Sequence, residues 1–294
     1  MFFCDWVIGH EYSGVVEDPG PRTDLKKGDR VTSITMDPDL NCPYCLEGND
    51  NLCDANGGAP GSSPNYGACS EYFAARADLV CKLPDNVSDE EGAMIEPASV
   101  AYHGVKRVGV KKGDKVLITG AGVIGAFAAE WCRYFGAGLV VATDVNMNRA
   151  NKLVEFGACN AVFDAKSSDL ESQLLGISGG GFDVYIDTTG FVSVINESLN
   201  VLKKGRPMLE LGVNFMETEM LNMFNITIKE YTVMGSFAYT VAEFKEVIDV
   251  MASKKINFQR YAGKKFSLPD VQQAFEYLDR KDINDFKVML SMHL

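Results

Sequence analysis

Three cysteines and an aspartate lie close together in the first fifth of the chain. Cys42 and Cys45 form a Cys-x-x-Cys pair, Cys53 follows in the same loop, and Asp39 precedes Cys42 by the same step of three residues. A structural zinc ion takes four ligands in a tetrahedron, and a carboxylate can replace one of the thiolates. We therefore predict that these four residues hold a structural zinc ion, with three free thiols in a loop as the alternative.

The turn Gly9-His10-Glu11 is a second candidate for metal chemistry. Among the chain's three histidines, His10 alone adjoins an acid in a glycine-flanked turn, although a simple surface pair explains these two residues equally well. A further acid, Glu96, stands in Ile95-Glu96-Pro97, flanked by apolar residues just before a predicted helix. An unpaired carboxylate is costly in such surroundings, so Glu96 is expected to have a partner.

A glycine-rich loop, Gly120-Ala121-Gly122-Val123-Ile124-Gly125, matches the GxGxxG pattern of dinucleotide binding. Gly120 would permit the tight turn, Gly122 would let the backbone approach a pyrophosphate, and Gly125 would let the following helix pack close to its strand. The pyrophosphate is expected at the N-terminus of that helix, where free N–H groups favour an anion. A glycine turn without a ligand is the alternative.

Asp144 ends the next predicted strand, at the distance from the loop where such sites carry an acid. Its carboxylate would accept hydrogen bonds from the adenosine ribose and repel the 2′-phosphate of NADP, which predicts NAD as the cofactor. Arg149 is a counter-indication, because an arginine can accommodate a 2′-phosphate.

The elements that must position these residues change in character along the chain. Up to about residue 100, short β-like runs alternate with turns, which predicts an irregular β-rich unit. From Lys115 onward strand, turn and amphipathic helix repeat, and six such strands predict a parallel, doubly wound α/β sheet. The predicted strands are Ser13–Glu17, Asp29–Ile34, Glu71–Ala75, Leu79–Lys82, Val116–Thr119, Leu139–Thr143, Ala161–Phe163, Asp183–Asp187, Met208–Leu211, Thr232–Gly235, Arg260–Phe266 and Lys287–Leu290, and the predicted helices are Val123–Phe135, Asn146–Phe156, Leu170–Leu175, Val192–Leu202, Phe244–Met251 and one begun by Pro269-Asp270.

Composition narrows the classes of partner. A net charge of −12 without a basic stripe argues against nucleic acid, and the sequence has neither an apolar run of membrane-spanning length nor a signal peptide. Eight cysteines in such a chain suit metal binding or buried thiols better than a disulfide framework. We expect a cytoplasmic protein of two domains that acts on a small molecule.

Taken together, the motifs resemble the zinc-dependent medium-chain dehydrogenase/reductase family, most closely its sorbitol (L-iditol) or polyol dehydrogenase branch and the related threonine dehydrogenases. The resemblance runs over essentially the whole chain. It implies a GroES-like β-rich catalytic domain formed by residues 1–100 and 256–294 around an NAD-binding Rossmann domain at 101–255, assembled as a dimer or tetramer. The matching segments are GHEYSGVV (Gly9–Val16), KKGDRV (Lys26–Val31), the cysteine loop, GAMIEPASVAYHGV (Gly92–Val105), TDVNMNRA (Thr143–Ala150) and the glycine loop.

The resemblance also implies roles for single residues. His10 would ligate a catalytic zinc, Glu11 would be a ligand or a close neighbour of it, and Glu96 would lie beside the metal and the substrate. Zinc would lower the pKa of a substrate hydroxyl, and hydride would pass to NAD in a cleft that excludes water. The residues implied to line the NAD site are Gly120, Gly122, Ile124, Gly125, Asp144, Arg149, Leu211, Gly212, Val213, Ser236 and Phe237.

Two departures from the family pattern bear on this reading. Members carry several dozen residues before the Gly-His-Glu motif, including a Cys-Gly-(Ser/Thr)-Asp loop that supplies a cysteine ligand, whereas His10 is the tenth residue here. We expect a truncated chain; a zinc held by His10, Glu11 and Glu96 without a thiolate is the alternative. Polyol dehydrogenases also have an Arg-Tyr pair that contacts substrate; here Tyr239 is kept and the arginine is not.

Because the arginine is replaced, the substrate could also be another secondary alcohol, a sugar phosphate or an amino alcohol. Two other functions are consistent with the sequence. One is a non-enzymatic NAD-binding paralogue that has lost the catalytic cysteine loop. The other is a zinc-free reductase of the same superfamily, which the retained His10-Glu11 and cysteine loop disfavour.

Overall fold

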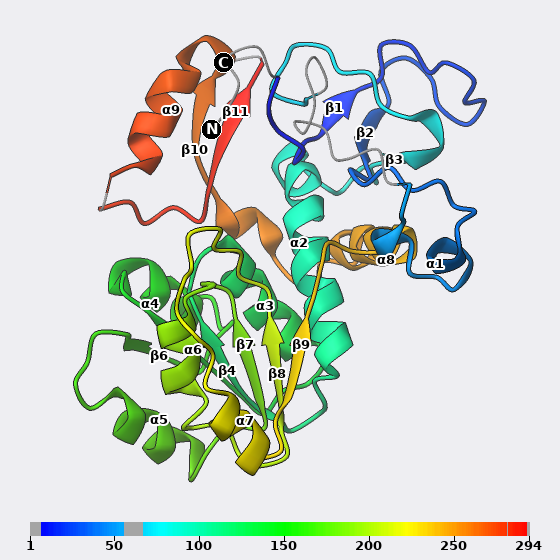
Figure 1. The fold of residues 1–294 in the computed structure, drawn as a ribbon. Coiled ribbons are helices and arrows are strands. Elements are labelled where there is room, and N and C mark those ends of the chain that lie inside the picture. Colours follow the sequence, from blue (N-terminus) through cyan, green and yellow to red (C-terminus); the bar gives the residue numbers. More distant parts are fainter. Residues whose placement is uncertain (1–6, 56–66, 281, 293–294) are drawn as a thin grey trace. The chain divides into compact units, whose positions relative to one another are not determined.

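The computed structural model describes residues 7–55, 67–280 and 282–292, which fall into two compact units (Figure 1). One unit comprises residues 1–100 and 238–294, and the other comprises residues 101–237. The sequence-based division ended the Rossmann domain at residue 255, and that boundary stays a prediction. In the described part of the chain, no helix has the length and apolar character needed to cross a membrane.

The unit of residues 101–237 is built on a six-stranded sheet whose strands are all parallel (Figure 1). The strand order is β6-β5-β4-β7-β8-β9, so the chain leaves β4 in one direction and later returns to its other side. This is the doubly wound arrangement that the sequence predicted, and it confirms the α/β class. The strands are β4 (Lys115–Thr119), β5 (Leu139–Asp144), β6 (Ala161–Asp164), β7 (Val184–Asp187), β8 (Pro207–Glu210) and β9 (Thr232–Gly235), and the helices are α3 (Val123–Tyr134), α4 (Met147–Glu155), α5 (Leu170–Ser178), α6 (Val192–Ser198) and α7 (Met223–Ile228).

Continuous apolar runs explain why these segments form central strands. Val116, Leu117 and Ile118 of β4 are completely buried, as are Val140 and Val141 of β5. Parallel strands are covered on both faces, so they need apolar side chains on both rather than an alternation. The acidic side chains of the sheet stand at the carboxyl ends of β5, β6, β7 and β8, and that edge is where doubly wound sheets bind ligands.

The other unit contains two small sheets. Strands β1, β2 and β3 form an antiparallel sheet in that order, and β10 pairs with β11 in parallel (Figure 1). Its strands are β1 (Gly14–Val15), β2 (Arg30–Ser33), β3 (Val80–Lys82), β10 (Ala262–Ser267) and β11 (Lys287–Ser291), its helices are α1 (Pro43–Leu46), α8 (Val241–Ala252) and α9 (Val271–Leu278), and its 3-10 turns are Asp50–Leu52, Ala77–Leu79, Phe258–Tyr261 and Leu268–Asp270.

Two local predictions need correction, and two short helices were not predicted. The predicted strand Glu71–Ala75 is irregular, because its backbone pairs with no neighbouring strand in the described residues. Helices α1 and α7 were not predicted; each is shorter than two turns and leaves almost no periodic pattern. Glu96 does not precede a helix but lies inside α2 (Asp89–Val108).

Helix α2 begins at a capping box that the sequence does contain. The Ser88 hydroxyl accepts from the Glu91 backbone N–H at 3.1 Å, and the Glu91 carboxylate accepts from the Ser88 N–H at 3.0 Å. This reciprocal pair satisfies two N–H groups that the first helical turn leaves without partners. Pro97 also lies within the helix, which therefore begins before Glu96 and not after it.

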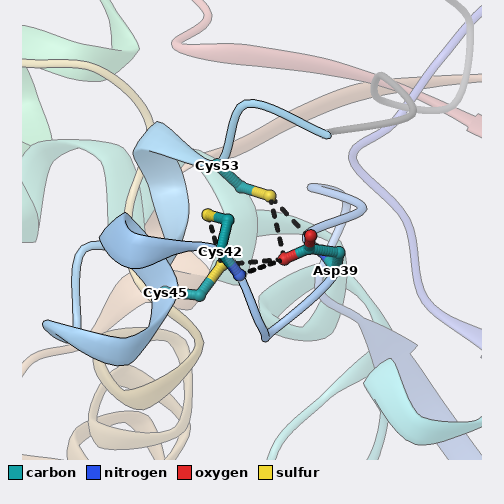
Figure 2. Close-up of side chains that lie close together, drawn as sticks. All are labelled: Asp39, Cys42, Cys45 and Cys53. Atoms are coloured by element: carbon teal, nitrogen blue, oxygen red, sulfur yellow. Dashed lines mark hydrogen bonds between the residues drawn. The ribbon is translucent and has the colours of Figure 1, made fainter.

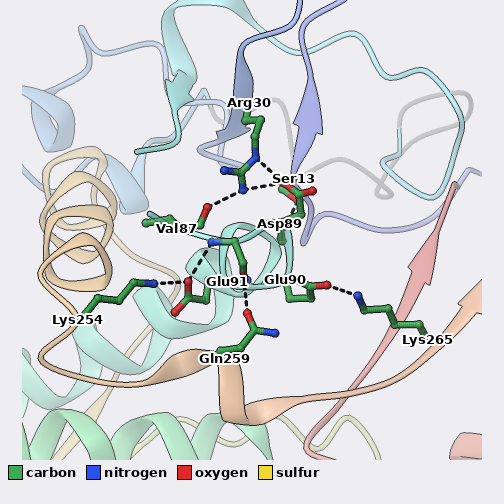
Figure 3. Close-up of polar contacts among 10 residues, drawn as sticks. Ser13, Arg30, Val87, Asp89, Glu90, Glu91, Lys254, Gln259 and Lys265 are labelled. Atoms are coloured by element: carbon green, nitrogen blue, oxygen red, sulfur yellow. Dashed lines mark hydrogen bonds and ion pairs between the residues drawn. The ribbon is translucent and has the colours of Figure 1, made fainter. Parts of the chain in front are cut away.

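Three consecutive acids in the first turn of α2 each pair with a cation from a different segment (Figure 3). Asp89 pairs with Arg30 of β2 at 2.7 Å, and Glu90 pairs with Lys265 of β10. Glu91 pairs at 2.5 Å with Lys254, which follows α8. Acids near a helix N-terminus are also favoured by its dipole, so the helix that carries Glu96 is fixed at its start from three directions.

Replacing Lys254 by methionine tests this anchoring. The Glu91 side chain is only 3% exposed and would lose its cation, so we expect the free energy of unfolding to fall by about 1–2 kcal/mol, measured by urea denaturation. Lys27→Met is the matched control, because Lys27 and Glu17 are both exposed and such pairs contribute little. Equal losses in the two variants would contradict the anchoring role.

Candidate functional site

The four residues of the cysteine cluster converge as predicted (Figure 2). Their ligand atoms all lie within 4.8 Å of one another. The Cys42 and Cys45 Sγ atoms are 3.5 Å apart, and Asp39 Oδ1 lies 3.5 Å from the Sγ atoms of Cys45 and Cys53. Two ligands about 2.3 Å from a tetrahedral zinc ion are separated by about 3.7 Å, so the spacing fits that ion.

Backbone geometry holds this cluster together. Asp39 Oδ1 accepts from the N–H groups of Asn41 and Cys42 at 2.8 and 2.9 Å, and these bonds lower the pKa of Asp39 to about 2. Leu40 takes the left-handed conformation, with φ of 59°, which turns the chain sharply between Asp39 and Cys42. The carboxylate is therefore ionised and already oriented.

The thiols of the cluster are not equivalent. A backbone hydrogen bond from Cys45 lowers the pKa of Cys42, which favours a thiolate there. Desolvation and hydrogen bonds with Cys42 and Cys53 raise the pKa of Cys45 to about 12. One negative thiolate suppresses ionisation of the next, and a bound cation would remove that penalty.

The second predicted set also converges. Ligand atoms of His10, Glu11 and Glu96 lie within 4.8 Å of one another, although Glu96 is far from the other two in sequence. Partial desolvation and the positive charge of Lys287 lower the pKa of His10, even though the residue as a whole is exposed. A neutral imidazole at neutral pH has the lone pair that a metal requires.

Glu96 has hydrogen-bond partners within its own unit, residues 1–100 and 238–294. Its side chain is buried at 8% exposure, and burial raises its pKa to about 7 against the opposing effect of hydrogen bonds with Tyr239 and Thr35. The Tyr239 hydroxyl lies 2.8 Å from Thr35 Oγ1 and is fully buried. Burial without a counter-charge is the state that a bound cation would relieve, so Glu96 fits a metal site.

Lys287 was not identified from the sequence. Its ammonium pairs with Glu11 Oε2, and the two residues lie at opposite ends of the chain. Thr35 was missed as well, because nothing in its local sequence links it to Glu96. The contacts of Lys287 with Glu11 and of Thr35 with Glu96 join residues far apart in the sequence, so only the tertiary structure reveals them.

The glycine loop and its acid are joined directly. Asp144 Oδ2 accepts from the Ala121 N–H at 2.6 Å, and Oδ1 accepts from Asn146 N–H at 2.7 Å. Gly120 has φ of 91°, in the region that favours glycine, and a Cβ on Gly125 would lie 1.9 Å from the Gly120 carbonyl oxygen. Both glycines are thus required by the backbone, as predicted.

Arg149 contacts the same acid. Its Nη2 lies 3.2 Å from Asp144 Oδ2, while its buried Nε has no hydrogen-bond partner among the described residues. The guanidinium therefore offsets part of the Asp144 charge that would repel a 2′-phosphate. The structure therefore supports the argument that Arg149 weakens the preference for NAD over NADP.

The remaining predicted NAD residues occupy the carboxyl ends of β8 and β9 and the start of α3. Gly212 follows β8, and a Cβ there would lie 2.1 Å from the Gly190 backbone nitrogen. Val213 and Phe237 are 72% and 61% exposed. Their contacts with NAD, like those of Ile124, Leu211 and Ser236, stay predictions.

The chain is similar to known dehydrogenases in sequence and in fold. The zinc-binding dehydrogenase family matches residues 123–253, and the alcohol dehydrogenase GroES-like domain family matches residues 2–85. D-xylulose reductase of Saccharomyces cerevisiae is 33% identical in a match that covers 97% of this chain and 81% of that protein. The chain belongs to the zinc-dependent medium-chain dehydrogenase family.

Other members of the family extend the comparison. Sorbitol dehydrogenase 2 of the same yeast is 32% identical over 92% of this chain and 77% of its own length. A putative zinc-binding dehydrogenase from Sinorhizobium meliloti, bound to NADP, is 27% identical with a TM-score of 0.87, over 97% of this chain and 83% of that one. Family membership confirms the predicted fold, a GroES-like domain with a Rossmann sheet.

Two glycine substitutions separate the loop's structural role from its ligand role. Gly122 has open space around its missing Cβ, so Gly122→Ala should change stability by less than about 0.5 kcal/mol and still weaken NADH binding at least tenfold. Gly125→Ala should instead lower stability, by about 2 kcal/mol or more, because its methyl group meets backbone. Thermal unfolding and NADH fluorescence titration measure both. A Gly122→Ala variant that binds NADH normally would refute the placement of the pyrophosphate.

Proposed function

We propose that this protein is a zinc-dependent oxidoreductase that moves a hydride between NAD and the carbinol carbon of a polyol-type secondary alcohol. The observation that carries the proposal is the convergence of His10, Glu11 and Glu96 in a protein with the dinucleotide loop of the family. The relatives named D-xylulose reductase and sorbitol dehydrogenase support a polyol as the substrate class.

In the proposed catalytic site, His10, Glu11 and Glu96 would hold the catalytic zinc. Zinc, when bound, supplies a Lewis acid that lowers the pKa of an alcohol hydroxyl. His10 offers a neutral ring nitrogen, and Lys287 holds Glu11 in place by their ion pair. Tyr239 and Thr35 orient the Glu96 carboxyl, so the buried Tyr239 is proposed to position an acid beside the substrate as well as to contact it.

In the proposed structural site, Asp39, Cys42, Cys45 and Cys53 would hold the second zinc. Helix α1 and the 3-10 turn at Asp50–Leu52 contribute little apolar surface, and the loop between Asp39 and Cys53 has exposed Leu40, Leu46 and Leu52. Four metal bonds would replace the core that this loop does not have.

NAD is proposed to lie across the carboxyl edge of the sheet. The pyrophosphate would rest on Gly122 and the start of α3, and the ribose would bond Asp144. Ile124, Leu211, Gly212, Val213, Ser236 and Phe237 would line the rest of the site, and Arg149 would lie beside the ribose. The ordered contact between Ala121 and Asp144 supports this placement.

A non-enzymatic NAD-binding protein is a second candidate. It is favoured by one observation: within the described residues, the cluster of His10, Glu11 and Glu96 includes no thiol. Assays with sorbitol and with the pentitols formed by D-xylulose reduction separate the two, since only the oxidoreductase reduces NAD. We also propose a cytoplasmic location and a dimer or tetramer of identical chains; neither is needed for the assay.

Two substitutions should remove the two zinc ions separately. His10→Ala is expected to bind one zinc per chain, to keep NADH affinity and to lose at least a hundredfold in kcat/KM. Cys45→Ser should lose the other zinc and unfold at lower temperature. Cys81→Ser, at a half-buried cysteine outside both clusters, is the control and should keep two. Metal analysis after dialysis measures all three, and two zinc ions retained by His10→Ala would contradict the catalytic site.

Cofactor choice should respond in opposite directions to two neighbouring changes. Asp144→Ala removes the carboxylate, so we expect weaker NAD binding and a preference for NAD over NADP reduced about tenfold or more. Arg149→Ala leaves that carboxylate without its counter-ion and should increase the preference. The ratio of kcat/KM values for the two cofactors tests this. A shift in the same direction for both variants would be inconsistent with electrostatic discrimination by Asp144.

A further inference from the structure

Asp50 joins the cysteine loop, residues 39–53, to the start of α8. It opens the 3-10 turn Asp50–Leu52, and its Oδ1 accepts from the Val241 backbone N–H at 2.9 Å. The two residues are 191 positions apart in the sequence, and both belong to the unit of residues 1–100 and 238–294. The carboxylate of Asp50 is not among the ligand atoms of the cysteine cluster. Asp50 therefore connects the loop to a helix without taking part in the cluster.

The first turn of α8 leaves the Val241 N–H for an acceptor outside the helix. The helix begins with a capping box, in which the Thr240 hydroxyl accepts from the Glu243 N–H at 3.2 Å and the Glu243 carboxylate accepts from the Thr240 N–H at 3.0 Å. The Val241 N–H takes no part in that box, and the first N–H groups of a helix have no partner within it. Asp50 supplies the acceptor, and the helix dipole favours its negative charge at this end.

Tyr239 lies directly before this cap. Its side chain is 1% exposed, and its ring packs against Phe244 of α8 with the ring centroids 5.4 Å apart. Ala238 has φ of 49°, in the left-handed region, so the chain turns sharply just before Tyr239. The Tyr239 hydroxyl lies 2.8 Å from Thr35 Oγ1 and accepts from the Thr35 N–H at 3.3 Å. A shift in the first turn of α8 would therefore move this hydroxyl.

The hydroxyls of Tyr239 and Thr35 both hydrogen-bond the Glu96 carboxyl. Glu96 is buried, and its ligand atom lies within 4.8 Å of those of His10 and Glu11. Groups that hydrogen-bond the ligands of a metal fix the direction of those ligands, and replacing such a group costs about 10- to 100-fold in metal affinity or activity. An unbroken series of contacts thus runs from the cysteine loop through the start of α8 to the Glu96 carboxyl.

We propose that Asp50 is a positioning residue for Glu96. By holding the first turn of α8, Asp50 fixes the Tyr239 hydroxyl, and that hydroxyl in turn sets the direction of the Glu96 carboxyl. The cysteine loop then serves the catalytic site as well as holding its own metal. The inference rests on the proposed function, in which Glu96 belongs to the catalytic zinc site, whereas the contacts that lead from Asp50 to Tyr239 are independent of that function.

Asp50→Ala, compared with Asp50→Asn and Glu47→Ala in the full chain, tests the proposal. Alanine removes the acceptor, whereas asparagine keeps an acceptor oxygen at the same reach. Glu47 is an exposed acid of the same loop outside the metal cluster, so its replacement removes an equal charge. Only Asp50→Ala should lower kcat/KM with a polyol, by about tenfold and mostly in kcat, while the NADH Kd of all three variants stays within about twofold of wild type. An unchanged kcat/KM in Asp50→Ala would overturn the proposal.

Two structural measurements decide the role of Asp50 even if the wild-type protein turns over no polyol, a result that would refute the proposed function alone. Hydrogen exchange of the Thr35 N–H, which donates to Tyr239, should be about tenfold faster in Asp50→Ala and unchanged in the other two variants. A crystal structure of Asp50→Ala should show the Tyr239 hydroxyl beyond hydrogen-bond distance of Thr35 and the Glu96 carboxyl turned from its present direction. Unchanged exchange, or unchanged positions of Tyr239 and Glu96, would overturn the proposal whatever the activity.

Val241→Pro covers the case in which Asp50→Ala does not fold. Proline removes the N–H that Asp50 accepts from, and it is tolerated at the first residue of a helix. Thr240, with φ of −84° and ψ of 158°, already has the extended conformation that proline requires of the residue before it. We expect the same faster exchange at Thr35 and the same loss in kcat/KM as in Asp50→Ala. If Val241→Pro matches the wild type in both, the proposal fails.

Discussion

The sites of this protein depend on one physical constraint: a carboxylate withdrawn from water must gain a partner or a proton. Glu96 is buried beside His10 and Glu11, where a cation would be its partner. Asp144 accepts from the backbone N–H groups of Ala121, in the glycine loop, and of Asn146. Each solution also fixes the position of a functional element.

The fold supplies these partners through a few rigid elements. Parallel strands end together at one edge, so Asp144, Asp187 and Glu210 lie along the same edge although they are far apart in the chain. Helix α2 carries Glu96, and its first turn is fixed by three ion pairs and a capping box. The cysteine loop has few apolar contacts, and its four ligand atoms are already close enough together for a zinc ion.

Local patterns made much of this predictable. The glycine loop, the cysteine spacing and the apolar strands depend on neighbours in sequence, and they predicted the sheet and the cysteine cluster. The grouping of His10, Glu11 and Glu96 was predicted only through the family resemblance. The start of α2 also has a local signal that was not used, since Ser88 and Glu91 form a recognisable cap. The partners of the acids could not be predicted from the sequence. Lys287 for Glu11 and Thr35 for Glu96 depend on tertiary contacts.

The most direct test of the account is a crystal structure of the zinc-loaded protein with diffraction data collected on both sides of the zinc absorption edge. The account predicts two anomalous peaks per chain, one among Asp39, Cys42, Cys45 and Cys53 and one among His10, Glu11 and Glu96. A peak at the cysteine cluster alone would contradict a catalytic zinc and favour the NAD-binding protein without turnover. Peaks away from both clusters would contradict the assignment of the metal sites altogether.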